Sequence, residues 1–224
     1  MAGTTEAEPV ALVTGGSSGI GRATALALLD AGYRVLICAR GQEGLDAVVR
    51  EVGDDRLAAH ACDAGDPAQA RAVVEATVAR FGRLDAVICA HGVIGSFQPI
   101  EELDAAGWDD VLRTNLMGQI NITTAAIGAL RATRGSVVLI ASVNAHQAEP
   151  VMAPYGVSKV YGVNGHRPDF TMTRMRPNVV WSPTSGAPPP NEPSSATRSI
   201  AVSGCFVAIG HAPGGPRAVD YDAA

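Results

Sequence analysis

Residues 10–21 read VALVTGGSSGIG, a short apolar run that leads directly into a glycine-rich turn. The first five residues have the length and composition of a fully buried strand, and a helix is expected over Ala23–Ala31. In such a turn, Gly15 permits a tight bend, Gly19 lets the backbone approach a pyrophosphate, and Gly21 lets helix and strand pack closely. The start of the helix supplies unpaired N–H groups for phosphate oxygens. The stretch therefore predicts a dinucleotide-binding turn, with a glycine turn that binds nothing as the simpler alternative.

Strand-like and helix-like segments alternate along the chain up to about Ala141. Strands are expected at Val10–Thr14, Tyr33–Ala39, Leu57–Cys62, Leu84–Ala90 and Ser136–Ala141, and further helices at Gly41–Val52, Pro67–Phe81 and Trp108–Ala132. This alternation is typical of βαβ units and predicts an α/β fold, a Rossmann-like doubly wound parallel sheet with helices on both faces. Ligands bind such sheets beyond the carboxyl ends of the strands.

Composition narrows the class of partner. The chain has 224 residues, which suits one domain, and a formal net charge of −5 without a basic block, which argues against nucleic acid or an anionic membrane. No apolar run is long enough to span a bilayer, and the first nine residues do not resemble a secretory signal. The cysteines are far apart and predict buried thiols in a reducing, cytoplasmic compartment, with no metal site: Cys38, Cys62, Cys89 and Cys205.

Tyr155 and Lys159 are four residues apart, so on a helix they project from the same face. A free tyrosine has a pKa of about 10, and a fixed positive charge beside it lowers that pKa toward neutrality. Such a tyrosine can exchange a proton with a substrate oxygen. The pair therefore suggests a general acid/base, with an ordinary surface pair as the alternative.

Taken together, the spacing Thr14-Gly15-x-x-x-Gly19-Ile20-Gly21, then Asn115, Ser142 and Tyr155-x-x-x-Lys159, resembles the short single-domain branch of the short-chain dehydrogenase/reductase family. The resemblance covers the chain from about Val10 to Lys159. It implies that Tyr155 is the proton donor and acceptor, and that Lys159 holds the nicotinamide ribose and lowers the tyrosine pKa. Ser142 would hydrogen-bond the substrate oxygen, and Asn115 would hold a water in a proton relay.

The resemblance also implies a nicotinamide cofactor and the residues that bind it: Gly15, Ser17, Ser18, Gly19, Ile20, Gly21, Arg40, Asp63, Ala90, Gly92, Tyr155 and Lys159. Asp63 would contact the adenine. The second strand ends in Cys38-Ala39-Arg40, which offers a cation for a 2′-phosphate instead of an acid for the ribose hydroxyls. NADP(H) is therefore favoured, and NAD(H) remains the alternative because acidic residues follow at Glu43 and Asp46.

Two segments depart from the family pattern. After the fourth strand the family has Asn-Asn-Ala-Gly, whereas this chain has Cys89-Ala90-His91-Gly92. The asparagines usually brace the sheet beside the cofactor, so His91 or water must substitute for them.

The second departure follows Lys159. Two glycines and a proline predict that the catalytic helix ends by about Gly165, and residues after 160 hold nine of the fourteen prolines. We expect one domain over 1–224, with a core at 9–160 and an irregular tail at 161–224. Within the tail, Arg176–Pro183 and Val202–Gly210 resemble the family's sixth and last strands. The tail is either a shortened end that adds strands to the sheet or an aberrant sequence on a truncated domain.

The sequence therefore predicts an NAD(P)H-dependent oxidoreductase that interconverts a carbonyl and a secondary alcohol of a small molecule. The alternatives are a catalytically impaired dinucleotide-binding module and a truncated product without function. A homotetramer or dimer of the family type is in doubt, because the tail disrupts the helix that would form the subunit interface. The resemblance does not select among steroid, sugar, polyol, fatty-acyl and small-ketone substrates.

Overall fold

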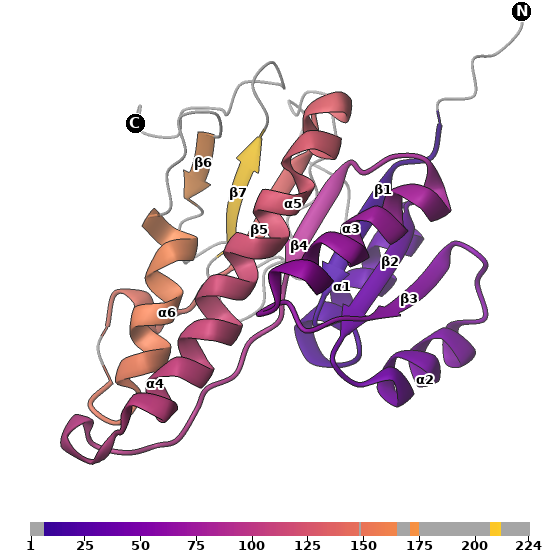
Figure 1. Cartoon of the computed structure of the whole chain (residues 1–224). Coiled ribbons are helices and arrows are strands. Elements are labelled where there is room, and N and C mark those ends of the chain that lie inside the picture. The colour runs from indigo at the N-terminus through magenta and orange to yellow at the C-terminus, as the bar shows by residue number, and fades with distance from the viewer. Residues whose placement is uncertain (1–6, 148, 165–170, 175–206, 212–224) are drawn as a thin grey trace, which may run out of the picture.

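Strand β1, which leads into the glycine-rich turn, lies between β2 and β4 in a seven-stranded sheet with strand order β3-β2-β1-β4-β5-β7-β6 (Figure 1). The computed structural model describes residues 7–147, 149–164, 171–174 and 207–211. The strands are β1 (Val10–Thr14), β2 (Arg34–Ala39), β3 (Leu57–Ala61), β4 (Ala86–Cys89), β5 (Ser136–Ile140), β6 (Thr171–Arg174) and β7 (Val207–His211). The helices are α1 (Gly19–Asp30), α2 (Gln42–Val52), α3 (Pro67–Phe81), α4 (Ala105–Leu112), α5 (Gly118–Thr133) and α6 (Ala153–Asn164).

The first five strands are parallel and carry helices on both faces, which confirms the predicted Rossmann-like architecture. Successive residues of a strand face opposite sides of a sheet. Leu12 accordingly packs in a core with residues of α3 and α5, whereas Ala11 and Val13 pack in a second core with residues of α1 and α2. Burial of a leucine side chain such as that of Leu12 contributes about 2 kcal/mol.

The predicted helix over Trp108–Ala132 is wrong in one respect, because it is not continuous. Helix α4 ends at Leu112, a π-helical turn η2 (Arg113–Met117) follows, and α5 begins at Gly118. A π-helical turn accommodates one extra residue within a helix and is common at functional sites. The turn contains Asn115, whose buried hydrogen bonds are described below.

The edge of the sheet differs from the parallel arrangement predicted for the whole sheet. Strand β7 overlaps the run Val202–Gly210 that resembles the family's last strand, but it pairs antiparallel with β5, and β6 pairs antiparallel with β7. An antiparallel strand needs no crossover helix to reach its neighbour. Helix α6 ends at Asn164, in agreement with the predicted stop. The run Arg176–Pro183 and Cys205 lie outside the described residues.

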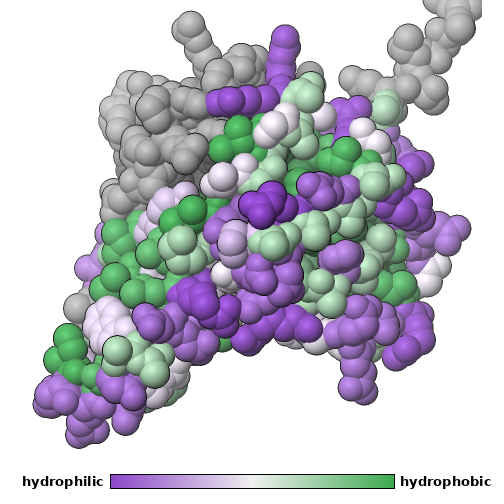
Figure 2. All heavy atoms as spheres, in the orientation of Figure 1, coloured by the Kyte–Doolittle hydropathy of each residue, from purple (hydrophilic) through white to green (hydrophobic). Residues whose placement is uncertain are grey.

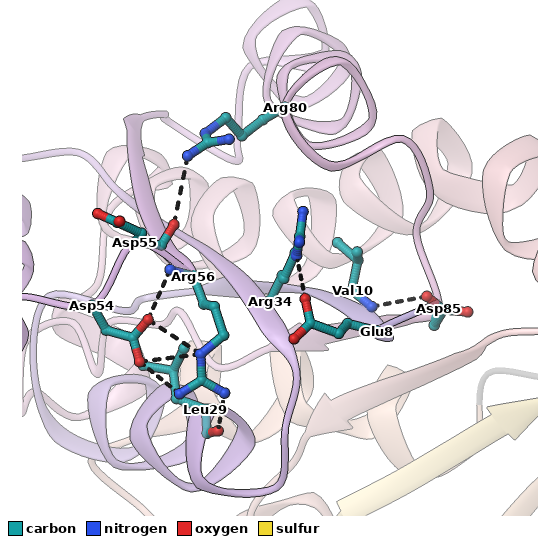
Figure 3. A network of polar contacts seen from close by, with 9 residues as sticks. All are labelled: Glu8, Val10, Leu29, Arg34, Asp54, Asp55, Arg56, Arg80 and Asp85. Atoms are coloured by element: carbon teal, nitrogen blue, oxygen red, sulfur yellow. Dashed lines mark hydrogen bonds and ion pairs between the residues drawn. The ribbon is translucent and has the colours of Figure 1, made fainter. Parts of the chain in front are cut away.

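Ion pairs gather at the amino ends of the strands (Figure 3). Just before β3, the Arg56 guanidinium pairs with Asp54 at 2.6 Å and donates to the Leu29 carbonyl at the end of α1. Before β4, Asp85 accepts a hydrogen bond from the Val10 main-chain N–H at 2.8 Å. These contacts tie β1, β3, β4 and α1 together at the edge opposite the polar motifs, so they serve the fold.

Hydropathy divides the surface (Figure 2). Hydrophilic residues dominate the lower right of the view, over α2, whereas hydrophobic residues gather on the left, where α6 lies. In α6 and the adjoining π-helical turn, Val157 and Val160 of α6 are 51% and 37% exposed, and Met117 of η2 is 44% exposed. Such exposed apolar side chains on neighbouring segments are typical of a contact surface.

Candidate active site

The predicted site residues meet at the carboxyl edge of the sheet. Gly15 follows β1, Arg40 follows β2, Asp63 lies two residues after β3, Ala90 follows β4, and Ser142 lies two residues after β5. Because the five strands are parallel, these positions share one edge. This is the edge at which open α/β sheets bind ligands.

The glycine turn has the shape of a phosphate cradle. A Cβ at Gly21 would overlap the Gly15 carbonyl oxygen, so the close packing of α1 on the turn requires glycine there. Gly19 has φ +52° and nothing within 4 Å of the position of a Cβ, so this part of the turn is open to a ligand. Ser18 caps α1 in extended conformation without a side-chain hydrogen bond to the helix. The first N–H groups of α1 therefore suit phosphate oxygens, and the residues present fit a dinucleotide.

Arg40 and Asp63 flank the place predicted for the adenosine half of the cofactor. Arg40 is exposed directly after β2. Asp63 accepts hydrogen bonds from Arg113 at 2.7 Å and from the Gly65 N–H at 2.9 Å. Partial burial alone would raise the pKa of Asp63, but these hydrogen bonds and the charges of Arg113 and Arg40 hold it below its usual value. Asp63 is thus a carboxylate fixed to the protein, with Arg40 within electrostatic range.

Tyr155 and Lys159 lie on α6 and face each other, as the spacing predicted. The Lys159 Nζ is 5.5 Å from the centre of the Tyr155 ring. Lys159 is only 5% exposed, and its Nζ donates to the Ile140 carbonyl at 3.1 Å. Tyr155 is half-buried. An ammonium group removed from water and held beside a phenol is the arrangement that proton transfer by tyrosine requires.

Asn115 is fully buried in the π-helical turn and joins two other segments. Its Oδ1 accepts from the Val93 N–H at 2.7 Å, and its Nδ2 donates to the Val93 carbonyl at 2.8 Å and to the Ser158 Oγ at 3.0 Å. Ser158 in turn donates to the Tyr155 carbonyl at 2.7 Å. Asn115 therefore locks the segment after β4 and helix α6 into one unit.

Ser142 is buried after β5, at the start of the short 3₁₀ turn η3 (Val143–Ala145). Its Oγ accepts a hydrogen bond from the Asn144 N–H at 3.2 Å, so the residue has the capping role that a serine often takes at this place. The turn packs against α6, because a Cβ at Gly156 would lie 3.1 Å from the Asn144 carbonyl oxygen. The hydroxyl can still donate its own proton to a ligand.

Three further residues belong to the site, although the motifs pointed to only one of them. Gln119 is buried and donates to the same Ile140 carbonyl as Lys159, at 3.4 Å. Ser158 connects Asn115 to α6, and His91 contacts Thr14. The sequence offered no signal for Gln119, because α5 carries other polar residues as well and burial is not visible in a sequence. For His91 the signal was the loss of both asparagines.

Metal, thiol and membrane sites each have requirements of their own. The described ranges contain no group of three His, Cys, Asp or Glu residues that could hold a metal ion. Burial raises the pKa of Cys89, at the end of β4, to about 12, so its thiol remains protonated at neutral pH. None of the described helices has the length and apolar character needed to cross a membrane.

The glycine cradle after β1 and the Tyr155/Lys159 pair at the same edge define a dinucleotide-binding α/β protein with an acid/base centre. The chain belongs to the short chain dehydrogenase family, whose model matches residues 9–171. This confirms the resemblance inferred from the motifs.

Relatives in the family are oxidoreductases with different substrates. A ketoacyl reductase of granaticin polyketide synthase from Streptomyces violaceoruber is 35% identical over 70% of its own length and 80% of this chain. D-threitol dehydrogenase from Mycolicibacterium smegmatis is 39% identical over 60% of its length and 70% of this chain. Actinorhodin polyketide ketoreductase, in a crystal structure with NADPH, is 38% identical and has a TM-score of 0.66. The match covers 62% of that chain and 70% of this one.

The match leaves part of each relative uncovered. The chain spans 62% of the length of the ketoreductase structure and between 60% and 75% of the length of eight curated relatives. The family match ends at residue 171, close to the point where the composition of the chain changes.

Proposed function

We propose that the chain interconverts a carbonyl and a secondary alcohol of a small molecule, with a nicotinamide dinucleotide as cofactor. One observation carries the proposal: Lys159 is buried with its Nζ 5.5 Å from the Tyr155 ring, at the same sheet edge as the glycine cradle. The names of the relatives, which include ketoacyl reductases and sugar or polyol dehydrogenases, support the reaction class.

In the proposed mechanism the protein positions the reactants and moves the proton. When bound, the reduced nicotinamide supplies the hydride. Tyr155 donates its phenolic proton to the substrate oxygen and recovers it in the reverse direction. The Lys159 ammonium holds the ribose hydroxyls, and its positive charge favours the phenolate that remains after transfer. Ser142 donates a hydrogen bond to the substrate oxygen.

We assign to the Asn115 side chain the positioning of this machinery. Its three hydrogen bonds fix Val93 and Ser158 and leave no amide hydrogen for a water. A water in the proton relay would therefore have to donate to an Asn115 oxygen rather than accept from the amide, and Lys159 would connect that water to the phenol.

NADP(H) is the proposed cofactor. The support is the exposed cation Arg40 directly after β2 and the absence of an acid at Ala39. Actinorhodin polyketide ketoreductase, whose crystal structure contains NADPH, is 38% identical to this chain and also supports NADP(H). The remaining cofactor contacts are proposed for the glycine turn, Ala90 and Gly92.

A titration of the purified chain with NADPH and NADH, with melting curves recorded alongside, tests folding, binding and cofactor choice together. We expect tighter binding of NADPH, and NADPH oxidation with at least one ketone of a broad panel. In Arg40→Ala the affinity for NADPH should fall by about tenfold while that for NADH is unchanged, because one charge-assisted contact contributes about 1.5 kcal/mol. Ala39→Asp should reverse the preference. Equal affinities for both cofactors in the unmodified chain would contradict the NADP(H) assignment.

We further propose that residues 1–224 form one domain in the cytoplasm. The described cysteines are free thiols, which supports a reducing compartment. Self-association through α6 and η2 is supported by the exposed Val157, Val160 and Met117. Light scattering should then give a mass above that of one chain, and Val157→Asp should lower it. A monomer at micromolar concentration would refute the self-association.

A further inference from the structure

His91 lies at the start of the turn that follows β4, and its ring ties this turn to β1. The His91 Nδ1 is 2.5 Å from the Thr14 Oγ1. The same hydroxyl oxygen accepts a hydrogen bond from the Ala90 N–H at 3.1 Å and lies 3.4 Å from the His91 main-chain nitrogen. Thr14 is 1% exposed, so these bonds are shielded from water. Side chain and main chain of the turn thus converge on one buried hydroxyl.

The other end of this turn contacts the catalytic residues. A Cβ at Gly92 would lie 3.2 Å from the Asn115 Oδ1 and 3.4 Å from the Lys159 Nζ. The next residue, Val93, is held by two of the three hydrogen bonds of the Asn115 amide. A displacement of the turn would therefore change the surroundings of Lys159 and Asn115 together.

The surroundings of the ring keep it neutral and orient it. A Cβ at Gly118 would lie 2.5 Å from the His91 Nε2, so the ring occupies space that only a glycine leaves on α5. The Nε2 is buried and has no hydrogen-bond partner among the described residues. Of the groups that influence the pKa of the ring, the Thr114 main chain favours the protonated form. Burial and the charge of Lys159 lower the pKa of His91 to about 4, against the opposing influence of Asp63. The Nδ1 is thus the ring's bonded atom.

We propose that His91 is a positioning residue for the reaction: through its Nδ1 and the Thr14 hydroxyl it holds the Ala90–Val93 turn in the place that cofactor binding and Lys159 require. The proposal rests on the proposed cofactor site. It assigns a role to a side chain that stands where the family pattern has a different residue.

The two ring nitrogens can be tested separately. An asparagine side chain presents a polar atom at the reach of Nδ1, whereas glutamine presents one at the reach of Nε2. We expect His91→Asn to keep the affinity for NADPH within about twofold of the unmodified chain. His91→Gln and His91→Leu should weaken it about tenfold, the equivalent of one buried hydrogen bond. They should also lower kcat at saturating NADPH, because displacement of the turn changes the surroundings of Lys159 and Asn115.

The measurement is NADPH binding by fluorescence titration, with kcat, KM and a melting curve for each variant. His60→Leu, the same change on β3, is the matched control and should leave NADPH affinity unchanged. His91→Leu combined with Thr14→Val should weaken binding by less than the product of the two separate factors, because both changes break the same contact. If the leucine variant does not fold, the comparison of Asn with Gln decides the question through the same titration.

Unchanged NADPH affinity and kcat in His91→Leu would overturn the role of His91, and so would equal effects of Asn and Gln. If the unmodified chain binds neither NADPH nor NADH, the proposed function and this inference both fail. If the unmodified chain binds NADPH but replacement of His91 changes neither the affinity nor kcat, the role of His91 is refuted and the proposed function is not.

Discussion

Replacement of Asn115 by alanine is the sharpest test of how the site is held together. Asn115 makes three hydrogen bonds of 2.7 to 3.0 Å, two to Val93 and one to Ser158, and is fully buried. Each contributes about 1 kcal/mol, and the main-chain groups of Val93 would be left without this partner. We therefore expect Asn115→Ala to lower the free energy of unfolding by about 3 kcal/mol, which is about 6–12 °C in Tm for a chain of this size.

Asn121→Ala is the matched control, because Asn121 lies six residues further along, on α5, and the described residues give its side chain one hydrogen bond, to the Ala64 carbonyl at 3.1 Å. The gain in helix propensity from Asn to Ala is common to both variants and cancels in the comparison. We expect the control to lose about 1 kcal/mol. Urea unfolding followed by circular dichroism measures both losses. Equal losses in the two variants would refute the conclusion that Asn115 joins the turn after β4 to the catalytic helix.

Three further outcomes are expected. Since the pKa of His91 is about 4 when folded and ordinarily 6.5, the unfolded chain takes up this proton first. The lowered pKa therefore contributes stability that is complete above about pH 6.5 and is lost toward pH 4, by about 1.4 kcal/mol per pH unit. The free energy of unfolding, measured in urea between these pH values, should fall less steeply with decreasing pH in His91→Asn than in the unmodified chain. Gly21→Ala should destabilise the chain by about 1–3 kcal/mol through overlap with the main chain of the turn, whereas Gly128→Ala, in open space on α5, should stabilise it by about 0.5–1 kcal/mol, both seen in urea titrations. Arg56→Ala should lower Tm without changing the Kd for NADPH, because Arg56 lies at the opposite edge of the sheet.

The sequence predicted the parallel part of the fold closely, because its signals are local. Five apolar runs became β1–β5 with bounds shifted by no more than two residues. The start of α3 at Pro67 was also predicted, and Asp66 caps this helix by accepting from the Ala68 and Gln69 N–H groups. Strand burial and helix capping depend on residues within one segment, so they can be recognised without tertiary contacts.

The features that the sequence did not predict depend on distant partners. The π-helical turn at Arg113–Met117 has no local marker, and it is held by the contacts of Asn115 with Val93 and Ser158. The antiparallel direction of β7 is likewise fixed by its pairing with β5. For His91 the sequence offered two substitutes for the missing asparagines, the ring or water, and only the position of the ring beside Thr14 favours the first.

The most direct test of the proposed mechanism is Tyr155→Phe, which removes the phenolic oxygen and keeps the ring beside Lys159. The account predicts that this variant binds NADPH with nearly the Kd of the unmodified chain, and that its turnover of any ketone substrate falls by a factor of about 10² to 10⁴, the usual contribution of a positioned acid/base. Turnover in Tyr155→Phe equal to that of the unmodified chain would contradict the account.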